Sequence, residues 1–226
     1  MRRPEFVARH GRRPEGWLGR LLAAVTAWET TKENNVALEL LEIRPGDRVL
    51  EIGFGHGRSI AAAARLTRGG LVAGADFSPT MVALASRRNR QLVDRGLADL
   101  RRADSLNLPF EDATFDKVFS VHTVYFWTTP VAHMREVRRV LKNNGRFVLG
   151  FRPESEQARR MFPASVYTFH PAEKIHQVLL SAGFRDVSIV DGGAAARGVI
   201  LAVASRAEAS TISGPPSNSW QDEPSF

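Results

Sequence analysis

An acidic residue followed by three glycines at alternate positions is the part of the chain whose residue types point most directly to chemistry. It occurs in the stretch VLEIGFGHGRS, where Glu51 precedes Gly53, Gly55 and Gly57. Glycines in a turn let a ligand approach the backbone closely, and a helix that starts there offers free N–H groups. The stretch therefore predicts a turn that binds a small polar ligand.

The spacing and the acid narrow the class of ligand. A dinucleotide-binding turn has the pattern G-x-G-x-x-G, whereas here the third glycine comes one residue early and position 58 is Arg. The carboxylate of Glu51 would face an anionic pyrophosphate unfavourably, but it suits a ligand that carries a cationic amino group. The chain also lacks the G-x-x-x-x-G-K-S/T pattern, so a nucleoside triphosphate is not expected.

The elements that must position this turn alternate between two hydrophobic periods. Short apolar runs alternate with segments of helical spacing, which predicts a layered α/β fold with a mostly parallel sheet. Ligands of such folds bind beyond the carboxyl ends of the strands, where the glycine turn lies. The predicted strands are 48–53, 71–76, 98–103, 115–121 and 146–151, and the predicted helices are 17–30, 34–42, 57–66, 79–95 and 130–141.

The C-terminal part completes the predicted sheet. Ile175, Val178 and Leu179 keep helical spacing, and two further apolar runs follow at about 184–190 and 198–204. The connection between these runs is short, which predicts an antiparallel hairpin at one edge. The chain is thus expected to form a three-layer αβα sandwich around a seven-stranded, mostly parallel sheet.

Composition divides the chain into parts around this sandwich. Residues 1–45 are expected to be an N-terminal helical lid region, and residues 46–205 the ligand-binding core. Within the core, 152–170 carries aromatic residues among arginines and is interpreted as a substrate lid. Residues 206–226 have the composition of a disordered tail.

Several motifs in order resemble the class I S-adenosylmethionine-dependent methyltransferases, a Rossmann-like family. The pattern E-x-G-x-G-x-G at the first strand is similar to the family's signature, and the similarity extends over about residues 46–151. The further motifs that carry it are Val72-Ala73-Gly74-Ala75-Asp76, Phe77-Ser78-Pro79-Thr80-Met81, Arg102-Ala103-Asp104-Ser105-Leu106, LPFEDATFD at 108–116 and RRVLKNNG at 138–145. In the last of these, Asn144 stands where the family commonly has a glycine.

The resemblance implies a cofactor and a set of residues that hold it. The cofactor is S-adenosyl-L-methionine, with S-adenosyl-L-homocysteine as product. Glu51 is expected at the amino-acid end, Asp76 at the ribose hydroxyls and Asp104 at the adenine amino group. The complete set of expected cofactor-binding residues is Glu51, Gly53, Phe54, Gly55, Gly57, Asp76, Phe77, Met81, Asp104, Ser105 and Val121.

The segment SVHTVYFW after the fourth strand should face the methyl acceptor. His122 is the best candidate for a general base, although it could instead only hydrogen-bond near the cofactor. Tyr125 is assigned a catalytic role with it. Tyr125 and Trp127 could line the acceptor pocket together with Trp28 and Tyr167, or they could belong to the core. No metal site is expected there.

Composition limits the class of acceptor and partner. The net charge of +7 comes mostly from arginines spread along the chain, which gives little support for a nucleic-acid partner. No apolar run is long enough for a membrane span, and the basic N-terminus lacks the apolar stretch of a secretory signal. With no cysteine in the chain, we expect a cytoplasmic protein. We expect it to be a monomer or homodimer.

The favoured function is methylation of a small molecule, of the kind carried out by ubiquinone-, menaquinone- and sterol-methylating enzymes, at oxygen rather than carbon or nitrogen. An RNA-modifying methyltransferase is its main rival, but the Asn/Asp-Pro-Pro-Tyr/Phe motif of amino-methylating nucleic-acid enzymes is absent after the fourth strand. A dinucleotide oxidoreductase is disfavoured by Glu51 and Arg58. A non-catalytic subunit that only binds the cofactor is also compatible with the glycine turn.

Overall fold

The short apolar runs of the sequence pair into one sheet, in a computed structural model that describes residues 30–196 and 198–207. The strand order is β3-β2-β1-β4-β5-β7-β6. All neighbouring pairs from β3 to β5 are parallel, and β7 is antiparallel to both β5 and β6. The strands are β1 (Val49–Ile52), β2 (Val72–Asp76), β3 (Ala98–Arg102), β4 (Phe115–Val121), β5 (Leu141–Phe151), β6 (Phe184–Asp191) and β7 (Ile200–Arg206).

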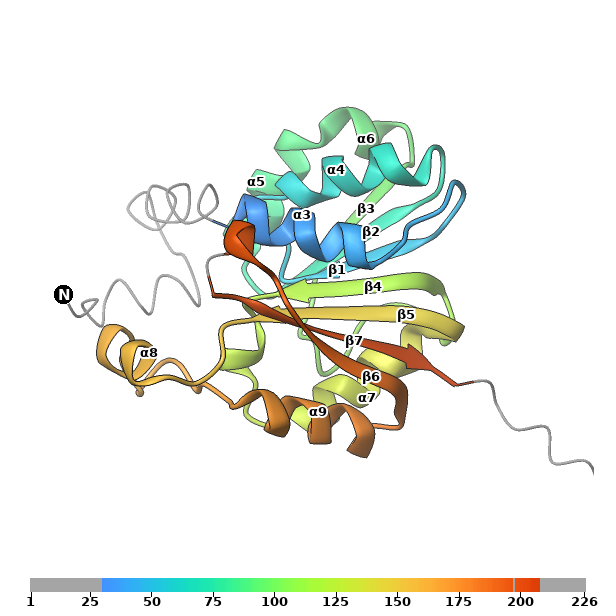
Figure 1. Cartoon of the computed structure of the whole chain (residues 1–226). Coiled ribbons are helices and arrows are strands. Elements are labelled where there is room, and N and C mark those ends of the chain that lie inside the picture. Colours follow the sequence, from blue (N-terminus) through green and yellow to red (C-terminus); the bar gives the residue numbers. More distant parts are fainter. Residues whose placement is uncertain (1–29, 197, 208–226) are drawn as a thin grey trace, which may run out of the picture.

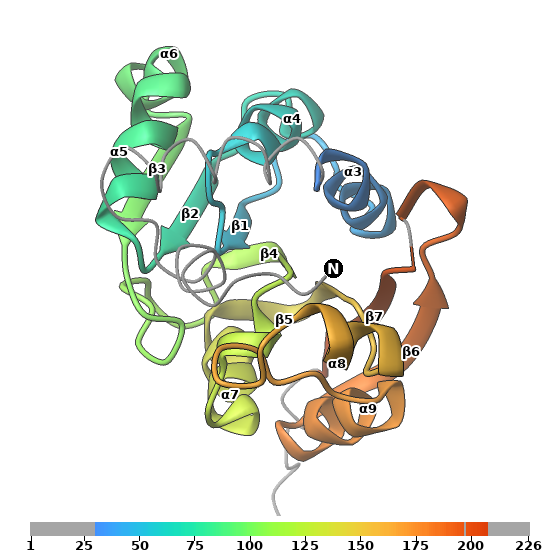
Figure 2. The same cartoon turned by 90° about the vertical axis from the view of Figure 1, so that its left-hand side faces the viewer.

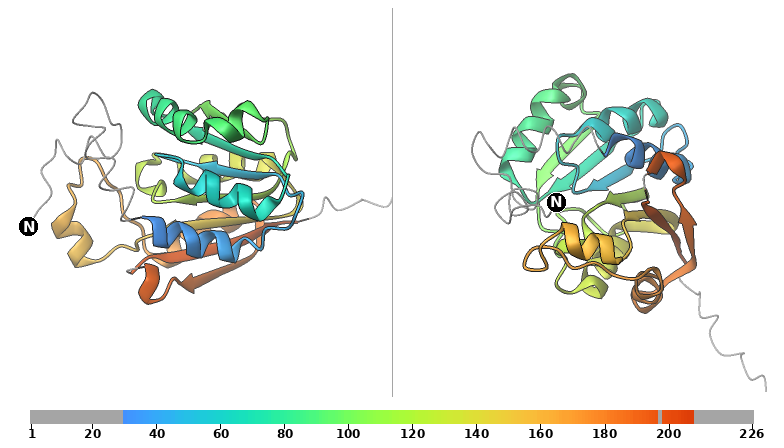
Figure 3. Two further views of the ribbon diagram at one scale, coloured as in Figure 1. Left: turned by 90° about the horizontal axis from the view of Figure 1, so that it is seen from above. Right: turned by 60° about the vertical axis from the view of Figure 1, so that its left-hand side comes forward.

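Helices cover both faces of this sheet (Figure 1). One face carries α3 (Thr31–Leu40), α4 (Arg58–Thr67), α5 (Pro79–Arg88) and α6 (Arg90–Asp94). The other face carries α7 (Pro130–Val140) and α9 (Ala172–Ser181). The short helix α8 (Glu156–Met161) stands apart at the end of the molecule where the parallel strands finish, as two views agree (Figures 1 and 3). Two 3-10 turns complete the elements, η1 (Val124–Phe126) and η2 (Ala194–Ala196).

The central strand β1 shows why the sequence forms this layered fold. All four of its residues are buried, because helices pack on both sides of the strand. Val49 packs with α3 and α4, while Leu50 and Ile52 pack with the α7 and α9 side. The one polar residue among them is Glu51, so an ionisable group lies in the middle of the core. The predicted three-layer fold and the antiparallel C-terminal hairpin are confirmed.

Two of the differences from the predicted boundaries have a clear physical cause. The predicted helix 79–95 is divided into α5 and α6 at Asn89, whose side-chain amide donates to the carbonyls of Ala85 and Gly57, both at 2.9 Å. That amide competes with the helical pattern and bends the chain toward the glycine turn. β5 begins at Leu141 rather than 146, because Leu141 pairs with Phe115 across an irregularity in the ladder.

Parts of the N- and C-terminal predictions lie outside the described residues. These are the helix at 17–30, most of the expected lid region 1–45, and the expected tail, of which only residues 206 and 207 are described. Trp28, predicted in the acceptor pocket, also lies outside them. In the part of the chain that the structure describes, no helix is long and apolar enough to cross a membrane.

Candidate active site

The glycine turn needs glycine because all three residues adopt left-handed backbone angles. Gly53, Gly55 and Gly57 have φ values of +75°, +52° and +69°. Gly57 is the N-cap of α4, so the turn ends where the helix N–H groups begin. Phe54, predicted to bind the cofactor, is only 4% exposed, and its ring occupies the space that a Cβ on Gly74 would need. Its side chain therefore lies in the core beneath the turn.

Glu51 lies behind the glycine turn and is almost completely enclosed. It is 3% exposed, and the hydroxyl of Ser59 on α4 donates to its carboxyl at 2.6 Å. Burial raises the pKa of Glu51 to about 8, and the charge of nearby Asp76 contributes in the same direction. The carboxyl thus joins β1 to α4 and is uncharged near neutral pH when no cation faces it.

Asp76 connects the turn after β1 with the turn after β2. One carboxylate oxygen accepts the N–H of Gly55 at 2.9 Å, and the other accepts the N–H of Ser78 at 2.8 Å. Burial raises the pKa of Asp76 above its usual value, and these two hydrogen bonds offset only part of the increase. The Ser78 hydroxyl in turn accepts the N–H of Met81 and caps α5. Met81 is itself buried.

The acid after β3 is in a different environment. Asp104 is exposed, and its carboxylate accepts the N–H of Leu106 at 2.9 Å. Next to it, the Ser105 hydroxyl hydrogen-bonds Nδ1 of His133 at 2.9 Å. Two large apolar side chains are exposed on these loops, Phe77 at 47% and Leu106 at 43%. The carboxyl ends of β2 and β3 therefore present an acid and an apolar side chain each, at the end of the sheet seen in Figure 2.

His133 of α7, which from the sequence was expected at the surface of a helix, is instead buried next to the candidate site. It is only 5% exposed, and its ring stacks on Trp127 with centroids 4.8 Å apart and planes 9° apart. Burial lowers the pKa of His133, which favours the neutral ring. Trp127, predicted in the acceptor pocket, is 6% exposed and belongs to the core. The structure thus places Trp127 in the core against His133, which bonds Ser105, and not on an open surface.

His122 and Tyr125 are brought together after β4, and Tyr125, like Trp127, belongs to the core, with 5% of the residue exposed. Nδ1 of His122 lies 3.0 Å from the Tyr125 hydroxyl, and Nε2 lies 3.1 Å from a carboxylate oxygen of Glu33. The backbone N–H of Arg152 donates to the Tyr125 hydroxyl. His122 itself has φ +62°, a left-handed conformation that is costly for a residue with a Cβ. This chain of groups can accept or pass on a proton.

Glu33 was not predicted, and the sequence held little signal for it. It lies in the first turn of α3, which begins three residues before the predicted helix 34–42. It is 4% exposed, although the surrounding sequence TKENN is polar. Its contact with His122 joins residues 89 positions apart, and only the three-dimensional fold reveals it.

Segment 152–170 packs its aromatic side chains against the residues after β4. The Phe169 ring lies 4.8 Å from Tyr125, and the Tyr167 ring lies 5.1 Å from Phe126. The backbone N–H of Thr168 also donates to the Tyr125 carbonyl at 3.0 Å. Tyr167 therefore lies in the same cluster as Tyr125, as the prediction of a shared pocket requires. Val121, expected at the cofactor, packs against the neighbouring backbone of Gly150.

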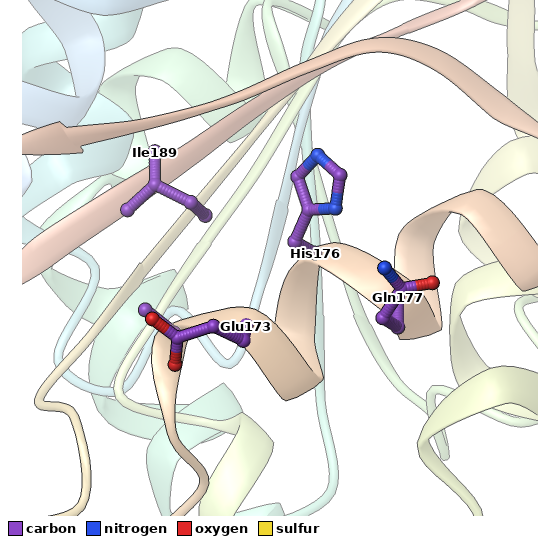
Figure 4. A pocket seen from close by; sticks show the side chains of 5 residues that line it. Glu173, His176, Gln177 and Ile189 are labelled. Atoms are coloured by element: carbon purple, nitrogen blue, oxygen red, sulfur yellow. The ribbon is translucent and has the colours of Figure 1, made fainter.

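A separate hollow lies on the outer surface between α9 and β6 (Figure 4). Glu173, His176 and Gln177 of α9 and Ile189 of β6 line it. None of the predicted site residues takes part. Among residues 30–196 and 198–207, no group of three or more His, Cys, Asp or Glu side chains could hold a metal ion.

Comparisons with known proteins agree with this arrangement. The family model described as a methyltransferase domain matches residues 50–149. YrhH of Bacillus subtilis, a suspected methyltransferase, is 29% identical over 69% of this chain and 78% of its own length. The demethylmenaquinone methyltransferase of Corynebacterium kroppenstedtii is 35% identical over 48% of this chain, and the match spans 43% of that enzyme, less than half its length.

A solved structure shares the fold over most of the chain. It is a chain in the complex between the Haloferax volcanii Trm112 methyltransferase activator and a suspected methyltransferase. The TM-score is 0.71 at 22% identity, and the likeness covers 92% of this chain and 100% of that one. At this identity the likeness concerns the fold alone.

Substitutions at two glycines test the geometry of the turn. A Cβ on Gly53 would lie 2.3 Å from Cγ2 of Thr123, whose hydroxyl is held by Ser120, whereas nothing lies within 4 Å of a Cβ on Gly55. We expect Gly55→Ala to lower the free energy of unfolding by about 1 kcal/mol from backbone strain alone. For Gly53→Ala we expect roughly 2–4 kcal/mol, because overpacking is added. Denaturant titration measures both, and equal losses would contradict the turn geometry.

The pH dependence of stability tests the burial of Glu51. This carboxyl ionises near pH 4.5 when unfolded and near pH 8 when folded. Its contribution is complete below pH 4.5 and is lost as the pH rises to 8, by roughly 5 kcal/mol at about 1.4 kcal/mol per pH unit. The side chain of Glu51→Gln cannot ionise, so the variant should not lose this stability. In urea titrations, the unfolding free energy of Glu51→Gln relative to that of the wild type should therefore rise by several kcal/mol between pH 4.5 and pH 8.

The control for this measurement is Glu39→Gln, which changes an exposed carboxyl on α3. Its difference from the wild type should be nearly constant over the same pH range. Parallel curves for Glu51→Gln and the wild type would mean that the Glu51 carboxyl is solvated in the folded protein.

Proposed function

The chain belongs to the class I S-adenosylmethionine-dependent methyltransferases, and from this premise we propose that it methylates a hydroxyl group of a small, largely apolar molecule. The observation that carries the choice of a hydroxyl is the contact of His122 with Tyr125 at 3.0 Å. A hydroxyl acceptor must lose a proton when it is methylated, and a proton acceptor near the reacting group speeds that loss.

The described residues fit the cofactor in the chemistry of their side chains. The cofactor supplies a methyl group on a positively charged sulfur, which a lone pair of the acceptor attacks. Asp76 offers carboxylate lone pairs at the mouth of the turn for ribose hydroxyls, and the space above Gly55 is open to a ligand. Phe77 and Leu106 would flank the adenine as apolar surfaces, with Asp104 at its rim.

Glu51 takes a more indirect part in this proposal than the sequence suggested. Its carboxyl is enclosed and bonded to Ser59, so it would act on the amino-acid end of the cofactor mainly by its charge. A cationic ammonium near the turn favours the ionised carboxyl and would draw the proton off Glu51. The glycine turn would thus become more negative when the cofactor binds.

A small apolar acceptor is supported by the cluster beside Tyr125. Phe162, Tyr167 and Phe169 pack against one another, and Phe169 packs against Tyr125, the hydrogen-bond partner of His122. Demethylmenaquinone methyltransferases, to which part of the chain is similar, are named for a small apolar acceptor. An RNA acceptor has less support, because no aromatic–basic alternation suited to stacking bases occurs around residues 120–127.

Calorimetry tests the assignment of the cofactor residues. Titration with S-adenosylmethionine should release heat, and titration with NAD should not. Asp76→Asn keeps the size of the side chain but removes its charge, so we expect at least a tenfold weaker Kd, equal to the loss of about one charge-assisted hydrogen bond. Asp94→Asn is the matched control, since Asp94 is exposed on α6 and pairs with Arg90 of the same helix. Unchanged affinity of Asp76→Asn would refute the assigned role.

A methyl-transfer screen tests the proposed reaction. Small-molecule fractions of cell extract are incubated with the protein and radiolabelled S-adenosylmethionine, and the labelled product is identified by mass spectrometry. His122→Asn tolerates the left-handed backbone, so it should fold normally. We expect it to lower kcat about 100-fold or more while the Kd of the cofactor stays within about twofold. Label appearing only in RNA, or a methylated carbon with an unaffected variant, would contradict the proposal.

A further inference from the structure

We infer that Glu33 is a positioning residue for this reaction: it fixes the proton of His122 on Nε2, so that Nδ1 is free to receive a proton through Tyr125. The inference rests on the proposed function. Glu33 would touch neither cofactor nor acceptor, because it reaches the site only through the imidazole ring. Its carboxylate lies 3.1 Å from Nε2, and the opposite side of the ring lies 3.0 Å from the Tyr125 hydroxyl.

The environment of Glu33 leaves His122 as its ionic partner. The carboxyl is 4% exposed, and within the described residues no lysine or arginine forms an ion pair with it. A buried carboxylate without a hydrogen-bond donor is unfavourable by several kcal/mol, so the Nε2–H of His122 satisfies a strong requirement. α3 packs against β4 and β5, which holds Glu33 over the end of β4.

The hydrogen bonds around Tyr125 decide which ring nitrogen carries the proton. The phenol oxygen accepts the N–H of Arg152, a donor that cannot act as an acceptor. Because Nε2–H is donated to Glu33, Nδ1 of the neutral ring is the nitrogen that can accept the Tyr125 hydroxyl proton. Nδ1 must then be unprotonated, and the ring proton lies on Nε2, where it is donated to Glu33. Each group in this chain has one role, and the carboxylate fixes the direction.

The backbone of His122 is held in place for the same arrangement. Its φ of +62° is a left-handed conformation that is unfavourable for a residue with a Cβ. Its N–H donates to the Gly150 carbonyl at 2.9 Å, which fixes the peptide next to β5. The ring is thus oriented from the backbone and from both nitrogens. Such strain at a site is maintained only when the surroundings impose it.

This arrangement gives the reaction a balanced course for the proton. The acceptor oxygen gains the methyl carbon and loses its proton, while the sulfur keeps the electron pair of the broken carbon–sulfur bond. The proton passes to the phenol oxygen of Tyr125 as Tyr125 gives its own proton to Nδ1. His122 becomes an imidazolium that faces the Glu33 carboxylate. Opposite charges at this distance favour the product of the transfer.

Among the described residues, four charged or titratable groups lie around the ring or its partner Tyr125. Glu33 faces it from α3, Tyr125 from η1, and Arg152 follows β5 next to the phenol. Tyr167 from the segment before α9 packs against Tyr125. Of these groups Glu33 is the carboxyl that contacts the ring, so Glu33 is the group to replace in a test of how the ring is held.

Glu33→Gln tests the inference because it keeps the size of the side chain and removes the charge. With an acceptor from the screen, we expect kcat to fall about 10- to 100-fold and the acid limb of the kcat–pH profile to move to lower pH by about one unit. The KM of the acceptor and the Kd of S-adenosylmethionine should stay within about twofold. Glu39→Gln on the exposed side of α3 should change none of these quantities.

A second measurement needs no acceptor. Long-range ¹H–¹⁵N correlation spectra of the imidazoles, assigned with His122→Asn, should show His122 as the Nε2–H tautomer in the wild type. In Glu33→Gln the single tautomer should give way to a mixture, because an amide can donate to the ring as well as accept from it. An Nδ1–H tautomer in the wild type would overturn the inference.

The two measurements separate the possible failures. If no acceptor is methylated, the proposed function fails, and the spectra still decide whether Glu33 fixes the proton of His122. If the wild type is active and Glu33→Gln has an unchanged kcat, the positioning role is refuted while the function stands. A lower kcat with an unmoved acid limb refutes it too, since that outcome marks a structural role only.

Discussion

The site depends on the two hydrogen bonds that Asp76 accepts from the turn after β1 and from the turn after β2. A single carboxylate thereby ties the N–H of Gly55 to the N–H of Ser78 and sets the distance between two neighbouring loops. The left-handed glycines can adopt many conformations, and this tether selects one of them. Glu51 supports the same turn from below through Ser59. The two acids have different roles. Asp76 fixes the two turns at the mouth of the site, and Glu51 lies in the core beneath them.

A second constraint joins parts of the chain that are distant in sequence. Glu33 in α3, His122 after β4 and Arg152 after β5 meet around the Tyr125 hydroxyl. The contact between His122 and Tyr125 lies within the methyltransferase match, whereas Glu33 precedes residue 50 and Arg152 follows residue 149. The matched domain thus contains the residues proposed for the cofactor, while its flanks supply two of the residues bonded to His122 and Tyr125. This division agrees with acceptor choice lying in additions to a common core.

The sequence predicted the layers, the hairpin and the glycine turn because local periodicity and short motifs decide them. It did not predict the division of helix 79–95, since the amide of Asn89 bonds a carbonyl in a different element. The sequence assigned Phe54 and Trp127 to binding surfaces, whereas both rings are buried. The identity of an aromatic residue next to a motif does not show whether its ring faces a ligand or the core. The burial of Glu33 and His133 was not predicted, because it depends on partners far away in the sequence. Ser105 is the partner of His133, and His122 is the partner of Glu33.

The left-handed backbone at residue 122 affects which substitutions are structurally favoured at that position. Glycine adopts this conformation without the steric conflict of a Cβ, so substitution to glycine relieves strain that histidine maintains. Without selection on the side chain, replacement of His122 by glycine is therefore structurally favoured, and glycine has no side chain that can take up a proton. Under the proposed reaction, a lineage keeps the histidine only while selection acts on the proton transfer, which would make position 122 a marker for separating active descendants from those that have kept only the fold.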